Sequence, residues 1–138
     1  MRQSGYVIRF DEINPVDRGR GVKTTPLVGK WMGSTTLTNG TTAFDAGASI
    51  ALHYHNCDES VVVLEGQAHC EIDGQVFELK ALDTTFIPAG VPHRFWNASN
   101  QATRILWTYA TAEVTRTFVE TGETVPHLSV RDRAVVSK

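Results

Sequence analysis

The feature that most constrains the fold is a series of short β-rich segments between residues 30 and 110, with no helical apolar period among them. Val, Thr, Phe, Ile and Trp are frequent within these segments, and Gly, Asn and Asp separate them. The expected strands are 49–55, 59–66, 84–90, 93–99 and 103–111. Many short strands with turn signals at close spacing predict an all-β sandwich or barrel.

Two dipeptides predict tight hairpins. Asn39-Gly40 lies within the β-rich stretch 31–47, and Asp73-Gly74 lies within 67–79. Asn-Gly and Asp-Gly suit the type I′ turn, in which both central residues have positive φ. We therefore expect one hairpin about each dipeptide.

Segment 59–65, ESVVVLE, carries apolar residues on both of its faces. Successive strand side chains point to opposite sides, so a strand of this kind is covered on both sides. One cover is the barrel interior, and the other is a second sheet or a second subunit. A second subunit would make the protein a homodimer, and the strand pattern leaves both covers open.

The 138 residues predict a single domain, because no second domain, repeat or low-complexity tract is evident. Residues 1–30 are expected to form an N-terminal arm or edge strands before a barrel at about 40–110. The tail 113–138 is expected to hold a short helical turn or a last strand. We interpret RGRGVK at 18–23 as a flexible loop, because no strand–helix context supports an anion cradle there.

Composition excludes several partners and compartments. The formal charge is −2 and the chain has no basic stripe, so no nucleic-acid or membrane partner is expected. The first twelve residues have no apolar run long enough for a signal-peptide core, which predicts a cytoplasmic protein. The two cysteines, Cys57 and Cys70, are too few for a disulfide framework and are expected to be free.

The stretch HYHNCDE at 53–59 is a candidate metal site. His53 and His55 point to the same face of a strand, and Glu59 follows across a tight connection to open the next strand. His93 follows a Pro- and Gly-rich turn and is a natural fourth ligand. Imidazole and carboxylate suit Fe, Mn, Ni, Co, Cu or Zn. The alternative is a set of hydrogen-bonded polar residues near strand ends.

Two spaced motifs in the chain resemble those of the cupin family. The first runs from Gly47 to Gly66 as GASIALHYHNCDESVVVLEG, and the second is LDTTFIPAGVPHRFWN, which ends at Asn97. The glycine that opens the second motif in the family is replaced here by Leu82, which puts the geometry of that turn in doubt. The resemblance covers about residues 40–110 and implies a double-stranded β-helix, or jelly-roll barrel.

The resemblance further implies one divalent transition metal inside the barrel, held by His53, His55, Glu59 and His93. Its identity among Fe, Mn, Ni, Zn, Co and Cu stays open, and small cupins of this kind often form dimers. The expected function is a metal-dependent enzyme acting on a small-molecule substrate. Iron would favour an O2-dependent dioxygenase, and the other ions an isomerase, lyase or decarboxylase acting by Lewis-acid chemistry. Glu59 is a candidate base as well as a ligand. The alternative is a non-catalytic metal-dependent binding or sensing module.

Four aromatic residues are candidates for the substrate pocket, although core packing would place them equally well. They are Phe44, Phe95, Trp107 and Tyr109.

Four other residues are expected to stand apart from the chemistry. We expect Cys57 to be a turn residue that points away from the metal, and Cys70 to be a small buried hydrophobe. His69 is expected to form a surface pair alongside Glu71. Asn97 is expected to fix a strand end.

Overall fold

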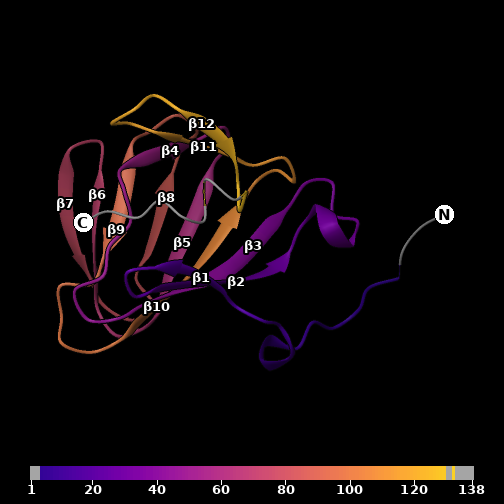
Figure 1. The fold of residues 1–138 in the computed structure, drawn as a ribbon, viewed down its shortest axis with the longest axis horizontal. Coiled ribbons are helices and arrows are strands. Elements are labelled where there is room, and N and C mark those ends of the chain that lie inside the picture. Colours follow the sequence, from indigo (N-terminus) through magenta and orange to yellow (C-terminus); the bar gives the residue numbers. More distant parts are fainter. Residues whose placement is uncertain (1–3, 130–131, 133–138) are drawn as a thin grey trace.

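The computed structural model describes residues 4–129 and Asp132, and its strands form two six-stranded antiparallel sheets (Figure 1). The first sheet has the order β1-β2-β3-β10-β5-β8, with β1 (Val16–Gly19), β2 (Val22–Val28), β3 (Thr38–Phe44), β10 (Thr103–Tyr109), β5 (Glu59–Glu65) and β8 (Thr84–Ile87). The second has the order β12-β11-β4-β9-β6-β7, with β12 (Thr124–Pro126), β11 (Thr115–Phe118), β4 (His53–His55), β9 (His93–Trp96), β6 (Ala68–Ile72) and β7 (Gln75–Leu79). Two short 3-10 turns, η1 (Phe10–Glu12) and η2 (Lys30–Met32), flank β1 and β2. The all-β prediction is confirmed.

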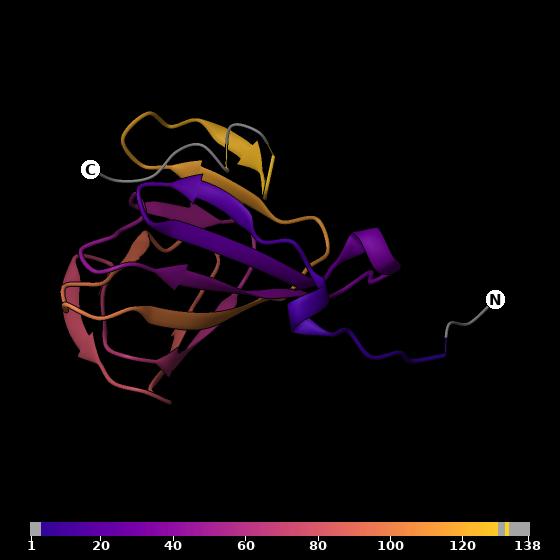
Figure 2. The same cartoon turned by 60° about the horizontal axis from the view of Figure 1, so that its bottom comes forward.

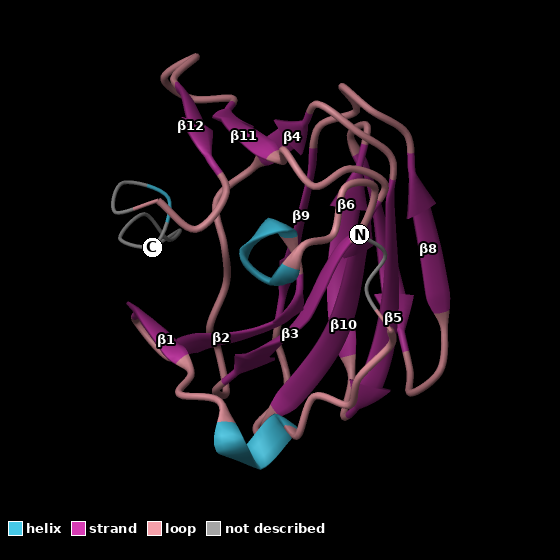
Figure 3. Ribbon diagram, turned by 90° about the vertical axis from the view of Figure 1, so that its right-hand side faces the viewer, coloured by secondary structure: helices cyan, strands magenta, loops and turns pink. Residues whose placement is uncertain are grey.

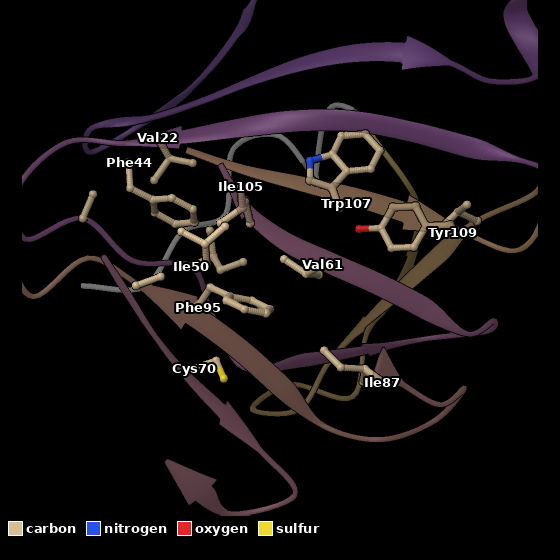
Figure 4. Close-up of a cluster of buried hydrophobic side chains, with 14 of the residues drawn as sticks. Val22, Phe44, Ile50, Val61, Cys70, Ile87, Phe95, Ile105, Trp107 and Tyr109 are labelled. Carbon is tan, nitrogen blue, oxygen red and sulfur yellow. The ribbon is translucent and has the colours of Figure 1, made fainter. Parts of the chain in front are cut away.

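The two sheets surround a common interior (Figure 3). Burial alternates along the strands that line it, so that in β10 every second residue from Thr103 to Tyr109 is buried. β5 and β9 show the same alternation. Their inward side chains, among them Val61, Phe95 and Trp107, form the core between the sheets (Figure 4). A period of two in burial is what places alternate residues of each strand inside a barrel.

The Asp73-Gly74 prediction is confirmed, whereas the hairpin predicted at Asn39-Gly40 is wrong. Asp73 and Gly74 join β6 to β7 with φ of 50° and 82°, as a type I′ turn requires. Gly40 instead lies inside β3, opposite Trp107 of β10. A Cβ built on Gly40 would come within 2.6 Å of the Trp107 ring and of the Thr25 carbonyl oxygen. This glycine makes room for a tryptophan rather than a turn.

Residues 18–23 are not the flexible loop that we predicted. They belong to the hairpin of β1 and β2, whose turn residues Arg20 and Gly21 have φ of 52° and 82°. This is the same pair of positive angles as in the β6–β7 hairpin, with an unusual arginine in the first position. β1 forms the edge of the first sheet, in agreement with the edge strands expected within 1–30.

The first half of the tail also contributes strands. β11 pairs with β4, and β12 covers the outer side of β11, so the expected last strand is present as a hairpin. Residues 130–131 and 133–138 of the predicted tail lie outside the described residues. The strand predicted at 49–55 is shorter than expected and begins only at His53. Within the described residues, no helix has the length and apolar character needed to cross a membrane.

Leu82 adopts the backbone conformation of the glycine that it replaces. Its φ is 75°, in the left-handed region, and its backbone N–H donates to the Val63 carbonyl oxygen at 2.6 Å. The side chain is 74% exposed, so no packing offsets the strain of this conformation. The turn geometry that the substitution put in doubt is therefore kept.

The outward face of β5 is only half covered in the single chain. Val62 and Leu64 are half-buried, and Phe86, on β8 next to Ser60, is 66% exposed. Apolar side chains on this face are consistent with the expected second subunit, which stays a prediction.

Candidate metal centre

Three buried histidines converge in the barrel interior. His53 and His55 occupy alternate positions of β4, and His93 opens β9 directly opposite His53. Each of the three is 2% exposed. Their candidate ligand atoms all lie within 4.8 Å of one another. The i, i+2 spacing on a strand therefore brings the pair together, as predicted, and the pairing of β4 with β9 adds the third ring.

Backbone carbonyls fix the orientation of all three rings. Nδ1 lies 2.7 Å from the Ala51 oxygen in His53, 3.0 Å from the Thr115 oxygen in His55, and 2.9 Å from the Val91 oxygen in His93. A carbonyl only accepts, so each Nδ1 carries the proton and donates it. Each neutral ring then presents the lone pair of Nε2 to the interior. Metal-binding histidines are held by such a bond from the other ring nitrogen.

Glu59 brings a carboxylate to the same point. Its Oε1 lies 2.9 Å from Nε2 of His93 and 3.7 Å from Nε2 of His55. None of these three buried atoms has a hydrogen-bond partner of acceptable geometry. With neutral rings the atoms are all acceptors, and acceptors packed together in a dry interior repel one another unless a cation or a proton lies between them.

The donor set fits a transition-metal ion. An ion about 2.0–2.2 Å from each ligand needs ligand atoms roughly 2.8–4.4 Å apart. The distances of 2.9 and 3.7 Å from Glu59 Oε1 fall within that range. The three imidazole atoms lie within 4.8 Å of one another, so their widest pair would close slightly around an ion. Three imidazole nitrogens and one carboxylate oxygen suit Fe, Mn, Co, Ni, Cu and Zn. His53, His55, Glu59 and His93 are therefore the residues that would hold the metal.

The local electrostatics keep the candidate ligands in their metal-binding forms. Burial lowers the pKa of His53 well below its usual value, and the Arg116 guanidinium lowers it further. Burial also lowers the pKa of His55 to about 3, against the opposing effect of Glu59. Burial alone would raise the pKa of Glu59, but His55, His93 and Arg116 outweigh it and lower that pKa. Neutral imidazoles and an ionised carboxylate are the forms that bind cations.

A small cavity adjoins the candidate ligands. Its volume is about 20 Å³, which is room for about one water molecule. Phe95, Trp107 and Tyr109 line it, together with His53, Glu59 and His93. Three of the four aromatic residues proposed for the pocket thus lie beside the candidate metal ligands.

Phe44 does not line this cavity. It packs in the core with Val22 and Ile50, at the end of the barrel away from Trp107 and Tyr109 (Figure 4). The inward parity of Phe44 on β3 is as expected, but its position along the strand places it too far from the histidines.

Sequence reasoning missed four polar residues of this interior: Arg18, Arg116, His127 and Asp132. Arg116 is 3% exposed and shares its strand parity with the buried Phe118 and with Val114, which directly precedes β11, so its parity carried the signal. The sequence around Arg18 and Asp132 shows no pattern that predicts their burial, because only the tertiary fold brings them to Arg116. Burial raises the pKa of Tyr109 well above its usual value, and the nearby Glu59 adds to this effect.

The remaining predicted residues have structural roles. Cys57 is a buried member of the core outside the histidine cluster, and Cys70 is a fully buried hydrophobe; both are free. His69 is paired with Glu78 at 3.2 Å rather than with Glu71, because Glu78 lies directly opposite it on β7. Asn97 fixes the end of β9 as expected.

The bonds of Asn97 explain its complete burial. Its Nδ2 donates to the carbonyl oxygens of Phe44, Asp45 and Gln101, and its Oδ1 accepts from Ser99. These bonds tie the chain after β9 to the end of β3.

Comparison with known proteins decides the family. The family model described as "Cupin domain" matches residues 40–109, which contain all four candidate ligands. The chain belongs to the cupin family. This cupin also superposes on an RmlC-like cupin from Shewanella frigidimarina, with a TM-score of 0.69, 27% identity, and coverage of 81% of this chain and 96% of that one.

Other relatives are larger proteins. The cupin is 31% identical over 102 residues to polyketide synthase CurC of Streptomyces cyaneus, across 73% of this chain and 66% of that protein. Oxalate decarboxylase of Bacillus subtilis superposes with a TM-score of 0.70 at 21% identity, over 80% of this chain and 31% of that one. One structure of that decarboxylase is described by its Mn(II) centres. At this identity the likeness shows the fold alone.

Proposed function

We propose that this cupin is a metal-dependent enzyme acting on a small organic molecule inside the barrel. The observation that carries the proposal is the face-to-face arrangement of the Glu59 carboxylate and the His93 Nε2 lone pair, 2.9 Å apart in a dry interior. Two facing acceptors that are shielded from water raise the free energy of the folded protein, and a cation bound to both atoms would offset this cost. The proposed ligands are His53, His55, Glu59 and His93, and three of them, His53, Glu59 and His93, also line the cavity.

The metal, when bound, supplies a Lewis acid that polarises a carbonyl or enolate, or a redox centre if it is iron. Glu59 is the proposed base, because its lowered pKa favours the ionised carboxylate and its side chain lines the cavity. Glu59 would leave the metal to take a proton from the substrate, and would return that proton after rearrangement. Phe95, Trp107 and Tyr109 exclude water and orient a planar substrate.

Substrate reaches the cavity from an outer pocket. That pocket has a volume of about 420 Å³ and is lined by Pro26, Trp31, Pro126 and Leu128 among others. His127 lines both the outer pocket and the inner cavity, and therefore separates them.

Turnover by the metal-loaded protein tests this proposal. Metal-free protein loaded with Fe(II) or Mn(II) is incubated with a panel of small hydroxy acids, keto acids and 1,3-dicarbonyl compounds, in air and without oxygen. We expect consumption of at least one compound by the wild type and none by the His53→Ala/His55→Ala variant. Oxygen uptake that matches substrate loss identifies a dioxygenase, and equal anaerobic turnover identifies an isomerase, lyase or decarboxylase.

A binding or sensing module is the second candidate. The small volume of the inner cavity, about 20 Å³, favours it, because an enclosed site suits retention of a small ligand more than passage of a substrate. A compound that binds tightly to metal-loaded protein and returns unchanged after long incubation would support this candidate over the enzyme.

A further inference from the structure

Two buried arginines line the same cavity as the candidate metal ligands. Arg18 comes from β1 in one sheet and Arg116 from β11 in the other, and both strands lie on the same side of the barrel (Figure 2). The two residues are 4% and 3% exposed. Arginine is almost never buried without a partner, so a pair in one small interior requires an explanation.

Among the described residues, Asp132 supplies the only carboxylate within ion-pair distance of these arginines. Arg116 Nη1 lies 3.2 Å from Oδ1 of Asp132, and Arg18 Nη2 donates to the backbone oxygen of Asp132 at 3.3 Å. The other Asp132 oxygen, Oδ2, accepts from the Leu128 N–H at 2.6 Å. The Nε atoms of both arginines are buried and have no hydrogen-bond partner. Asp132 itself does not line the cavity, whereas both arginines do.

The charges of this interior balance only without a metal. Among the described residues, Arg18 and Arg116 contribute two positive charges, and Glu59 and Asp132 contribute two negative charges. The histidines are neutral when they bind a metal. A divalent ion therefore leaves an excess of two positive charges in a space that excludes water, and an anionic ligand would offset them.

We propose that Arg18 and Arg116 form the binding site for the carboxylate of the substrate, whose other end meets the metal. This inference rests on the proposed function and narrows it to carboxylate-bearing small molecules. Guanidinium groups bind carboxylates through paired N–H donors, and the unpaired Nε atoms supply such donors. Thr24 and Thr42 line the same cavity, and their hydroxyl groups are hydrogen-bonded to each other at 3.0 Å. Asp132 serves as the internal counter-ion behind the site.

Isosteric probes with and without charge test the proposal. Glycolate and its neutral amide, glycolamide, are titrated into metal-free and Mn(II)-loaded protein by calorimetry. We expect glycolate to bind the loaded protein at least tenfold more tightly than glycolamide, because only glycolate is charged. Glycolate should also bind the loaded protein more tightly than the metal-free protein. Equal affinities for the two probes would overturn the proposal, as would tighter binding of inorganic phosphate than of glycolate.

Variants assign the effect to the arginines. Arg18→Gln should weaken glycolate binding about tenfold or more, leave glycolamide binding unchanged and retain the metal by elemental analysis. Arg20→Gln, at the exposed turn of the same hairpin, is the matched control and should bind glycolate as the wild type does. Unchanged glycolate affinity in a folded Arg18→Gln protein would refute the subsite while leaving the proposed enzyme function intact. Failure of the wild type to bind metal would refute that function instead.

A second variant keeps the proposal testable if Arg18→Gln does not fold. Asp132→Asn removes the internal negative charge while keeping the size of the side chain. The arginines then have less compensation, so we expect glycolate to bind several-fold more tightly than to the wild type. Weaker or unchanged glycolate binding in this variant would count against the proposal.

Discussion

Replacing Glu59 with glutamine should have opposite effects on the metal-free and metal-loaded protein. His93 donates from Nδ1 to the Val91 oxygen, so Nε2 of the ring is an acceptor. Glu59 Oε1 then faces Nε2 of His93 at 2.9 Å as one acceptor against another. Glutamine has nearly the same shape, and its amide group donates a hydrogen bond to that nitrogen. The substitution thus repairs an unsatisfied pair in the metal-free protein and removes a charged ligand from the metal site.

The magnitude follows from the cost of a buried unsatisfied group. Such a group costs about 1–3 kcal/mol, and more if it is charged, so Glu59→Gln should stabilise the metal-free protein by about 2 kcal/mol. For a chain of this length that is a rise in Tm of about 8 °C. Metal at a thousand times its Kd stabilises the wild type by about 4.1 kcal/mol. If the variant binds the metal about a hundredfold more weakly, the same metal concentration stabilises the folded variant by only about 1.4 kcal/mol.

Thermal unfolding at pH 8, with chelator and with Mn(II), measures both effects. Glu78→Gln is the matched control, because Glu78 Oε1 also faces a histidine Nε2, that of His69, at 3.2 Å, but is 85% exposed. Its free energy of unfolding should change by less than about 0.5 kcal/mol. A lower Tm of the metal-free Glu59→Gln protein would contradict this prediction, because it would show that Glu59 Oε1 has a favourable partner in the wild type.

Three further predictions concern pH, a strained turn and assembly. The free energy of unfolding of the metal-free protein should fall by at least about 1.4 kcal/mol per pH unit between about pH 6.5 and the pKa of His55, about 3. In this range the proton binds His55 only in the unfolded protein. A free energy of unfolding in urea that does not change over this range would contradict the prediction. Leu82→Gly should raise the free energy of unfolding by about 0.5–1 kcal/mol, because glycine adopts the left-handed conformation at φ 75° without strain and little buried surface is lost. A lower free energy of unfolding in the same urea assay would show that the Leu82 side chain contributes packing. The wild type should sediment as a homodimer and Phe86→Glu as a monomer, and identical sedimentation of the two would exclude the β5–β8 face as the interface.

The sequence predicted the fold class and the convergence of the histidines because both depend on local periodicity. Alternate positions on a strand share a face, so His53 and His55 had to point together. The hairpin at Asp73-Gly74 was equally local. The cupin motifs then extended the expectation to Glu59 and His93, across two connections whose geometry no local rule fixes.

The errors arose where distant residues decide the structure. Asn39-Gly40 has the composition of a turn, yet Gly40 is a strand residue because the Trp107 ring needs its space. Arg18 looked like part of a solvated loop, and only the meeting of β1 with β11 shows that it is buried beside Arg116. Two buried arginines that are about a hundred residues apart in the chain leave no pattern in the sequence around either of them.

The central claim is that this barrel holds a divalent transition metal on three histidines and a glutamate. Elemental analysis of the purified protein tests it most directly, beside the His53→Ala/His55→Ala variant prepared in the same way. We expect about one transition-metal ion per chain in the wild type and a loss of that metal in the folded variant. A wild type that takes up no metal on reconstitution, or a variant that keeps the metal, would contradict the assignment of these residues as metal ligands.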